Sequence, residues 1–164
     1  MKELLVIRHA KSSWQNPWED DFDRPLNDRG KRDAPFMAAE IQKKGVMLDA
    51  LISSDANRAF STCVYFGQQF PGVPIIKDSR LYQANVKNFF EVIHSLSDDY
   101  QRVALFSHNT GLTDFVNRLT KVRVDIVPTC GIYGVKADID HWTAFKNGKK
   151  AFWFFDYPKN HLIR

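Results

Sequence analysis

Short apolar runs alternate along this chain with longer segments of helical periodicity, and this alternation constrains the fold more than any other feature. The runs predict four strands, at residues 4–7, 48–54, 73–77 and 102–108. A segment that is predicted to be helical follows each of them. Strands that alternate with helices favour right-handed crossovers between parallel neighbours. We therefore expect an α/β fold, a three-layer sandwich with a mainly parallel central sheet and helices on both faces.

The predicted helices are identified by apolar stripes and by signals at their ends. In residues 24–45, Asn27 is a good N-cap, Gly45 closes the helix, and Pro35 is expected to kink it. The third helix is predicted at residues 85–97, and each stripe marks the face expected to point inward. In chain order the stripes are Ala34, Met37, Ala38 and Ile41; Ala59, Cys63, Phe66 and Phe70; Phe89, Ile93 and Leu96; and Leu112, Phe115, Val116 and Leu119.

The end of the chain departs from this alternation. Residues 130–138 and 149–157 are expected to form two strands joined by a loop, a hairpin at an edge of the sheet. Trp153, Phe154 and Phe155 are more aromatic than a half-exposed edge strand usually is. This favours core packing, with a dimer or partner surface as the alternative. Since no repeat or linker divides the 164 residues, we expect a single domain.

Composition and charge exclude several classes of protein. The apolar runs are far too short for a membrane span, and Arg8 interrupts the first run too early for a signal peptide. The net charge of +4 suits an anionic substrate, although a solvated surface alone explains it, and the basic residues are too scattered for a nucleic-acid tail. Two cysteines, Cys63 and Cys130, fit a reducing compartment. We expect a cytoplasmic protein with no nucleic-acid or membrane partner, and its oligomeric state is left open.

Polar side chains stand where three of the predicted strands end. The first strand ends in Arg8 and His9, and the fourth ends in His108. The second is followed by Arg58 in the first turn of a helix, where a cation opposes the helix dipole unless an anion binds there. The carboxyl ends of parallel strands share one edge of a sheet, where open α/β folds bind ligands. Each residue alone is more often a surface or structural residue, but together they predict a site for a phosphate-sized anion.

Three blocks in order resemble the signatures of the histidine phosphatase superfamily, which includes the phosphoglycerate mutases. "VIRHAKSSW" is similar to its Arg-His-Gly signature, and "SSDANRAFST" resembles its Ser-x-x-x-x-Arg-Ala-x-x-Thr block. "ALFSHNTGL" resembles the strand end that carries the second histidine. "DDFDRPLNDRGKRDA" and the short length look most like the SixA-type phosphohistidine phosphatase branch. The resemblance covers roughly residues 3–120 and implies a phosphoglycerate mutase-like fold.

The resemblance also implies a role for each matching residue. His9 matches the nucleophile that takes the phosphoryl group, and Arg8 and Arg58 match phosphate-binding arginines. His108 matches the second histidine, which stabilises the transferring group, and Arg24 matches a position near the phosphate pocket. A neutral imidazole is a competent nucleophile near pH 7, and water would hydrolyse the covalent phosphohistidine. No metal or cofactor is expected, and the implied partner is a phosphohistidine-bearing protein or a small phosphorylated substrate.

The chain departs from the superfamily pattern in ways that bear on the substrate. Ala10 replaces the usual glycine, a modest change if its φ is negative, and Asn109 stands where many members have glycine. Mutase-like members carry a carboxylate after the third strand to protonate an alkoxide, but "SRLYQANVKNFF" has none, and Gln83 and Asn85 cannot replace it. Such help is typically worth about 10²–10⁴-fold, whereas a leaving imidazole is already basic. The departure favours phosphohistidine, or another N-phosphorylated group, over phosphosugars.

The loop after His9 contains the nearest other carboxylates. They are interpreted as solvated residues or partners of Arg24, and a general-acid role for one of them is left open. They are Glu19, Asp20, Asp21 and Asp23. In the same loop Trp14 and Trp18 flank the predicted site, where they either wall the pocket or pin the loop.

Other kinds of site have less support in the sequence. A metal hydrolase would need ligand spacing, but the histidines show no i, i+4 pairing and no C-x-x-C motif exists; they are His9, His94, His108, His141 and His161. Neither cysteine is followed by an arginine that could close a phosphate loop, and the glycine motifs of nucleotide-binding loops are absent. Two alternatives stay open: a small-molecule phosphomonoester phosphatase of the same superfamily, and a non-catalytic module that binds phosphate.

Overall fold

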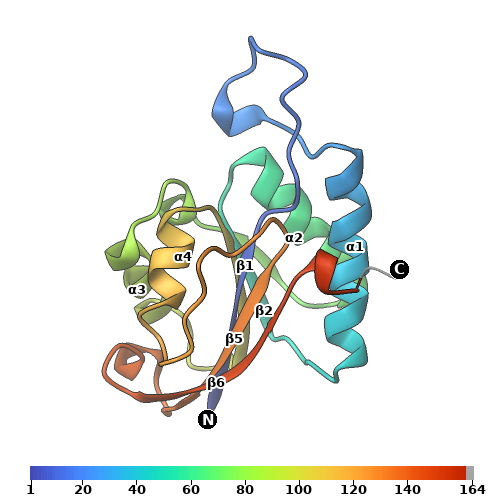
Figure 1. Ribbon diagram of the computed structural model, residues 1–164. Coiled ribbons are helices and arrows are strands. Elements are labelled where there is room, and N and C mark those ends of the chain that lie inside the picture. Colours follow the sequence, from blue (N-terminus) through green and yellow to red (C-terminus); the bar gives the residue numbers. More distant parts are fainter. Residues whose placement is uncertain (162–164) are drawn as a thin grey trace.

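The middle layer of the molecule is a six-stranded sheet (Figure 1). The structure is a computed structural model that describes residues 1–161. The strands are β1 (Lys2–Arg8), β2 (Ala50–Ser53), β3 (Ile75–Lys77), β4 (Arg102–Ser107), β5 (Ile132–Asp138) and β6 (Lys149–Asp156), in the order β3-β2-β4-β1-β5-β6. The first four are parallel, whereas β5 pairs antiparallel with β1 and β6 antiparallel with β5. The predicted mainly parallel sheet with a hairpin at its edge is confirmed.

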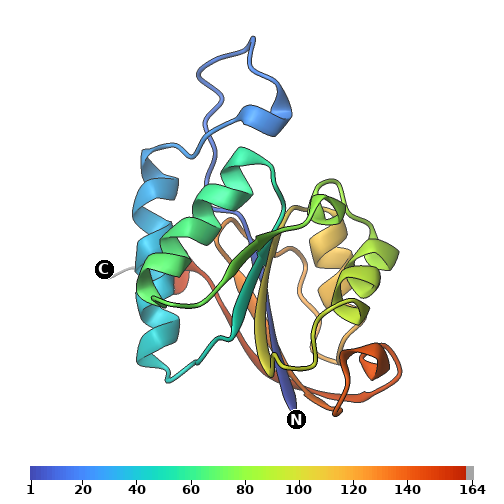
Figure 2. The same cartoon turned by 180° about the vertical axis from the view of Figure 1, so that it is seen from behind.

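Helices cover both faces of this sheet (Figures 1 and 2). They are α1 (Asp28–Lys43), α2 (Asn57–Gln69), α3 (Val86–His94) and α4 (Gly111–Val116). Side chains of a strand alternate between its faces: Leu5 and Ile7 of β1 pack with α1 and α2, while Leu4 and Val6 pack with α3 and α4. The predicted three-layer sandwich is confirmed. None of the helices within residues 1–161 is long and apolar enough to cross a bilayer.

The ends of α1 follow the signals in its sequence. The side chain of Asn27 accepts the N–H of Gly30 at 2.9 Å, as an N-cap does. At the other end Gly45 adopts a φ of +85° and donates its N–H to the carbonyl of Gln42, which ends the helix. The helix continues through Pro35, and the kink expected there stays a prediction.

Two predicted helices are shorter in the structure. α3 covers residues 86–94 rather than 85–97, and α4 ends at Val116, so the buried Leu119 lies beyond its helix. The reason at α4 is Asn117, whose side-chain amide bonds both the N–H and the carbonyl of Val124 at 2.8 and 2.9 Å. These bonds turn the chain out of the helix.

The aromatic end of the chain packs against the core. Trp153 and Phe154 of β6 contact the cluster under α1 and α2, and Phe155 contacts the cluster under α3 and α4. Phe152 stays partly exposed. The interpretation of this strand as core packing is therefore confirmed for three of its aromatic residues.

Between β1 and α1 the chain leaves the body as an arm, residues 14–24 (Figures 1 and 2). The base of the arm is closed by the N–H of Ser13, which donates to the carbonyl of Pro25 at 2.8 Å, and by an antiparallel bridge between Ser12 and Leu26. The arm follows a short segment, residues 9–13, that leads on from the carboxyl end of β1, so it stands beyond the edge where the predicted site lies.

Candidate active site

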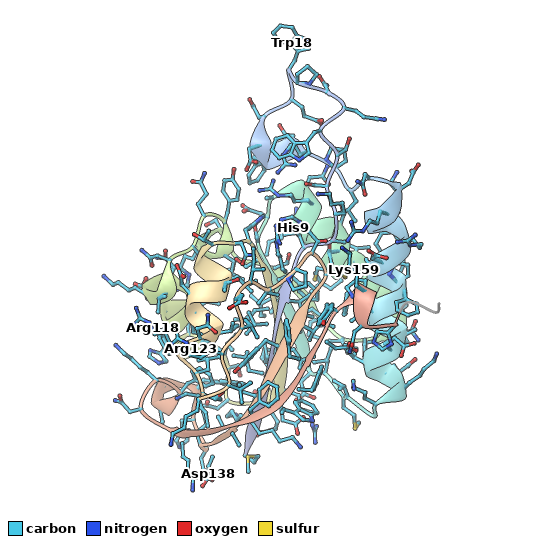
Figure 3. The ribbon with its side chains drawn as sticks, in the orientation of Figure 1. His9, Trp18, Arg118, Arg123, Asp138 and Lys159 are labelled. Atoms are coloured by element: carbon cyan, nitrogen blue, oxygen red, sulfur yellow. The ribbon has the colours of Figure 1, made fainter. Side chains whose placement is uncertain are left out.

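The residues predicted from the strand ends meet at the carboxyl edge of the sheet, where Figure 3 labels His9. Arg8 is the last residue of β1 and His9 follows it, while His108 follows β4. Because β1 pairs with β4 with Arg8 opposite Ser107, the two imidazoles come next to each other, and their ring centroids are 5.2 Å apart. Arg58 joins them from the first turn of α2. Both histidines and Arg58 are only 6% exposed, so the site is an enclosed cationic cluster.

His9 is held in one tautomer. Its Nδ1 lies 2.7 Å from the carbonyl of Ala10, and a carbonyl only accepts, so Nδ1 carries the proton. Burial, opposed by this hydrogen bond and reinforced by the charges of neighbouring groups, lowers the pKa of His9 to about 3. The ring is therefore neutral at pH 7. Among the described residues Nε2 has no hydrogen-bond partner, which leaves its lone pair available to attack an electrophile.

In His108, unlike His9, the ring nitrogen that forms a hydrogen bond is Nε2. Its Nε2 lies 2.8 Å from the hydroxyl oxygen of Ser54, which already accepts the N–H of Ala56 at 3.2 Å. Within the described residues that hydroxyl has no other acceptor, so its proton goes to Nε2 and the imidazole proton sits on Nδ1. Burial, followed by the charge of Arg58, lowers the pKa of His108 to about 3. His108 is thus a neutral ring that presents an N–H donor.

Unpaired donors gather at this site. Residues 1–161 contain five buried polar side-chain atoms without a partner, and three of them are Arg8 Nε, Arg58 Nε and His108 Nδ1. A buried donor left unpaired costs about 1–3 kcal/mol, so three in one place indicate an acceptor that the protein itself does not supply. Burial and then the charge of Arg58 lower the pKa of Arg8. Such a donor set is suited to the oxygens of a tetrahedral oxyanion.

Thr62 connects α2 to the loop that follows His9. Its Oγ1 accepts the N–H of Ala10 at 3.0 Å and donates to the carbonyl of Arg58, one turn earlier on α2, at 2.8 Å. The carbonyl of Ala10 then accepts Nδ1 of His9. Ala10 is buried and is not among the residues with positive φ, so its replacement of glycine is the modest change that was expected.

The arm brings a carboxylate to the edge of the site. Asp21 accepts from Arg58 Nη2 at 3.0 Å and from Arg24 Nε and Nη2 at 3.3 and 3.2 Å, and its backbone carbonyl accepts from Arg58 Nη1 at 2.6 Å. The hydroxyl of Tyr82 donates to the same carboxylate at 2.7 Å. Partial burial raises its pKa, but the donors outweigh burial and lower the pKa of Asp21 to about 2. Asp21 is therefore ionised and paired with arginines, so it holds no proton to donate. Its pairing with Arg24 was one of the two interpretations made from the sequence.

Arg24 is buried next to Asp21. It is only 6% exposed, and its Nη1 donates to the hydroxyl of Ser12 at 2.6 Å. The ring of Trp14 covers its guanidinium, with the Cζ atom 3.6 Å from the ring centroid. Trp14 therefore pins the arm through Arg24, while Trp18 lies at the tip of the arm and is 91% exposed (Figure 3).

The loop before β5 contacts the side chain of Arg8 through the carbonyl of Val127. The carbonyl of Val127 accepts Arg8 Nη1 at 3.1 Å and the side-chain amide of Asn109 at 2.9 Å. Asn109 also accepts the hydroxyl of Thr113 at 2.7 Å. A glycine at position 109 could not make these bonds, so the departure at Asn109 gives Arg8 a fixed partner.

The remaining histidines lie away from this edge, whereas the backbone N–H of Cys130 donates to the carbonyls of Arg8 and His9 at 3.1 and 3.0 Å. His94 is on α3, His141 pairs with Asp98 at 3.0 Å, and His161 pairs with Asp156 at 2.7 Å. Across residues 1–161 no group of three or more His, Cys, Asp or Glu side chains is placed to hold a metal ion. The two cysteines are buried free thiols.

Several residues of the site were missed in the sequence. Ser54 and Thr62 carried a usable signal, since one stands at the end of β2 and the other lies four residues after Arg58. Tyr82 and Val127 carried none, because loops that follow β3 and α4 bring them to the site.

Comparison with known proteins assigns the chain to a family. The family model of the histidine phosphatase superfamily (branch 1) matches residues 4–90, which is more than half of the chain. The chain belongs to the histidine phosphatase superfamily. The matched residues contain Arg8, His9 and Arg58, and His108 lies beyond them.

Two relatives match over half or less of their own length. An uncharacterized chloroplastic protein of Arabidopsis thaliana is 35% identical over 71 residues, 43% of this chain and 33% of that protein. Phosphoserine phosphatase 1 of Hydrogenobacter thermophilus is 27% identical over 110 residues, 62% of this chain and 50% of that enzyme. The chain thus spans half or less of the length of both relatives.

Solved structures match over nearly the whole chain. A SixA-type protein of Agrobacterium tumefaciens is 24% identical with a TM-score of 0.81, and the match covers 96% of this chain and 98% of that one. The protein histidine phosphatase SixA in complex with tungstate is 20% identical with a TM-score of 0.80, over the same shares of the two chains. The expected phosphoglycerate mutase-like fold of the SixA type is confirmed.

Proposed function

We propose that this member of the superfamily hydrolyses phosphohistidine in proteins, through a covalent phosphohistidine intermediate on His9 and without a metal ion. Nε2 of His9 attacks phosphorus while the bond from phosphorus to the leaving imidazole nitrogen breaks, and that nitrogen takes a proton from water. Arg8, Arg58 and Nδ1–H of His108 stabilise the charge on the equatorial oxygens. A water molecule then attacks phosphorus and releases inorganic phosphate and neutral His9.

The observation that carries this proposal is the set of three buried, unpaired donors beside a neutral imidazole with a free lone pair. This set can bind a tetrahedral oxyanion and attack it. The oxyanion tungstate bound to a protein histidine phosphatase of the same fold supports the same kind of ligand. Arg24 serves here as a partner of Asp21 near the pocket rather than as a direct phosphate ligand.

The choice of an N-phosphorylated substrate depends on the missing proton donor. Asp21, the arm carboxylate that reaches the site, is ionised and bonded to Arg58 and Arg24. An alkoxide leaving group would need an acid there, whereas a leaving imidazole can be protonated by water. A cytoplasmic location is part of the proposal, because Cys63 and Cys130 are free thiols that suit a reducing compartment.

The test compares a phosphohistidine peptide with p-nitrophenyl phosphate and phosphoserine, for the wild type, His9→Ala and Arg58→Ala. We expect the highest kcat/KM on phosphohistidine, no activity for folded His9→Ala, and a loss of about 10²–10³-fold for Arg58→Ala. Acid-labile, base-stable label should appear on His9, and EDTA should leave the rate unchanged.

Each alternative has its own signature in these measurements. Much faster hydrolysis of phosphoserine than of phosphohistidine would instead establish a small-molecule phosphomonoester phosphatase, for which the likeness to phosphoserine phosphatase 1 is the supporting observation. Phosphate binding without label or turnover would establish a recognition module. Loss of activity in EDTA that added metal restores would overturn metal independence.

A further inference from the structure

The arm presents aromatic surface to solvent beside the site. Trp18 is 91% exposed, Trp14 is 72% exposed, and Phe22 is 38% exposed. Single exposed apolar residues are ordinary, but three aromatic side chains within the short span of residues 14–24 form a patch. Tryptophan is among the residues that most often dominate the binding energy of protein interfaces.

Two of these three side chains, Trp14 and Phe22, are held in place by contacts beside the site. Trp14 stacks on Arg24, and Phe22 meets the ring of Tyr82 edge-on with centroids 5.2 Å apart. Asp21 joins the arm to Arg58, and Asn57 of α2 donates to the carbonyl of Asp23 at 3.0 Å. These contacts fix the part of the arm that lies against the body, so that part loses little conformational entropy when a partner binds.

The arm also carries unpaired negative charge. Of its four carboxylates, Asp21 is the one that forms ion pairs within residues 1–161; Glu19, Asp20 and Asp23 form none there. The chain as a whole has a net charge of +4, so this acidic, aromatic segment is unlike the rest of its surface. Its complement is a surface that is apolar and basic.

We propose that the arm is a docking surface for the phosphorylated protein, which contacts Trp18 with apolar and basic residues beside its phosphorylated side chain. This rests on the proposed function. The position of Trp18 selects the occupant: Figure 3 shows it at the tip of the arm, away from His9. A small phosphorylated compound seated on Arg8, Arg58 and His108 does not reach the tip, whereas a protein surface around the phosphate does.

The test uses three substrates and the full chain. Free phosphohistidine reports the chemistry of the site alone. Two phosphohistidine peptides of equal length, one flanked by Leu and Lys and the other by Ser and Glu, report docking. We expect the Leu/Lys peptide to have the highest kcat/KM, and its advantage over free phosphohistidine to shrink between 50 and 500 mM salt because the acidic arm is screened.

Trp18→Ala should lower the ratio of kcat/KM for the Leu/Lys peptide to kcat/KM for free phosphohistidine about tenfold or more, which is typical of an interface hot spot. Its kcat/KM on free phosphohistidine should stay within about twofold of the wild type. The matched control is Met47→Ala, because Met47 is 63% exposed and lies beyond the opposite end of α1. It should behave as the wild type on all three substrates.

Several outcomes would overturn the docking surface without touching the proposed chemistry. These are equal kcat/KM values for the two peptides, an unchanged peptide advantage in Trp18→Ala, or a wild-type dimer in light scattering that Trp18→Ala converts to a monomer. The last result would assign the arm to a second copy of the chain. Failure to hydrolyse free phosphohistidine would instead overturn the proposed function.

Discussion

The hydroxyl of Ser54 lies between the amide of Ala56 and the imidazole of His108, and its single proton determines the tautomer of that ring. With Ser54 as donor to Nε2, the unpaired Nδ1 of His108 is an N–H group. With the opposite tautomer Nδ1 would present a lone pair to the phosphoryl oxygens, which repels them. In the proposed mechanism, transition-state stabilisation therefore depends on a single residue that does not touch the substrate.

Removing this hydroxyl tests the tautomer directly. In Ser54→Ala we expect kcat to fall about tenfold to a hundredfold, somewhat less than the 10²–10³-fold cost of deleting an oxyanion donor, with KM nearly unchanged. The ¹⁵N shifts of the His108 ring should show Nδ1 losing part of its proton. Ser53→Ala is the control, since that hydroxyl donates to the carbonyl of Ser54 and not to His108. Equal losses in both variants would mean that Ser54 is merely structural.

At the scale of elements, the arm and α2 share one ionic contact above the site. The Asp21 carboxylate pairs with Arg58 of α2, with Arg24 at the base of the arm, and with the Tyr82 hydroxyl from the loop after β3. A phosphate dianion that arrives at Arg58 meets this negative charge. The arm thus partly neutralises the charge of Arg58 while it positions that side chain.

Asp21→Asn separates these two effects. The variant keeps a side chain of the same shape but removes one negative charge close to the phosphate pocket, so we expect inorganic phosphate and tungstate to inhibit several-fold more strongly than in the wild type. Asp23→Asn makes the same charge change two residues away, where the side chain forms no ion pair within the described residues, and should alter inhibition little. Weaker inhibition in Asp21→Asn would show instead that orienting Arg58 matters more than the charge.

At the scale of the whole molecule, the sequence predicts those parts of the structure that depend on local patterns of residues. Apolar runs locate β1, β2 and β4, and parallel pairing then brings His9 and His108 together, so the cluster of predicted site residues followed from strand ends. The contacts of Asp21 did not follow, because they join residues 37 and 61 positions apart through loops of irregular conformation. The length of α4 was missed for the same reason, since Asn117 ends it by bonding a residue outside the helix.

Burying two neutral imidazoles makes the stability of the whole fold depend on pH. The pKa values of His9 and of His108 are about 3 in the folded chain, against an ordinary value near 6.5. Below pH 6.5 the unfolded chain binds protons that the folded chain refuses, so the free energy of unfolding falls as pH drops from 6.5 towards 3. Each histidine contributes roughly 1 kcal/mol per pH unit in that window.

Urea unfolding in phosphate-free buffer measures this dependence, because a bound dianion would raise both pKa values. Between pH 6.5 and 5 we expect the free energy of unfolding to decrease less steeply for His108→Gln than for the wild type, by roughly 1 kcal/mol per pH unit, and least steeply for the double variant His9→Gln, His108→Gln. Carboxylates titrate identically in all three proteins apart from the direct effect of the substitutions, so the difference in slope belongs to the imidazoles. Parallel slopes would mean that the rings are protonated near their ordinary pKa in the folded protein, and a neutral His9 could then no longer be assumed at acidic pH.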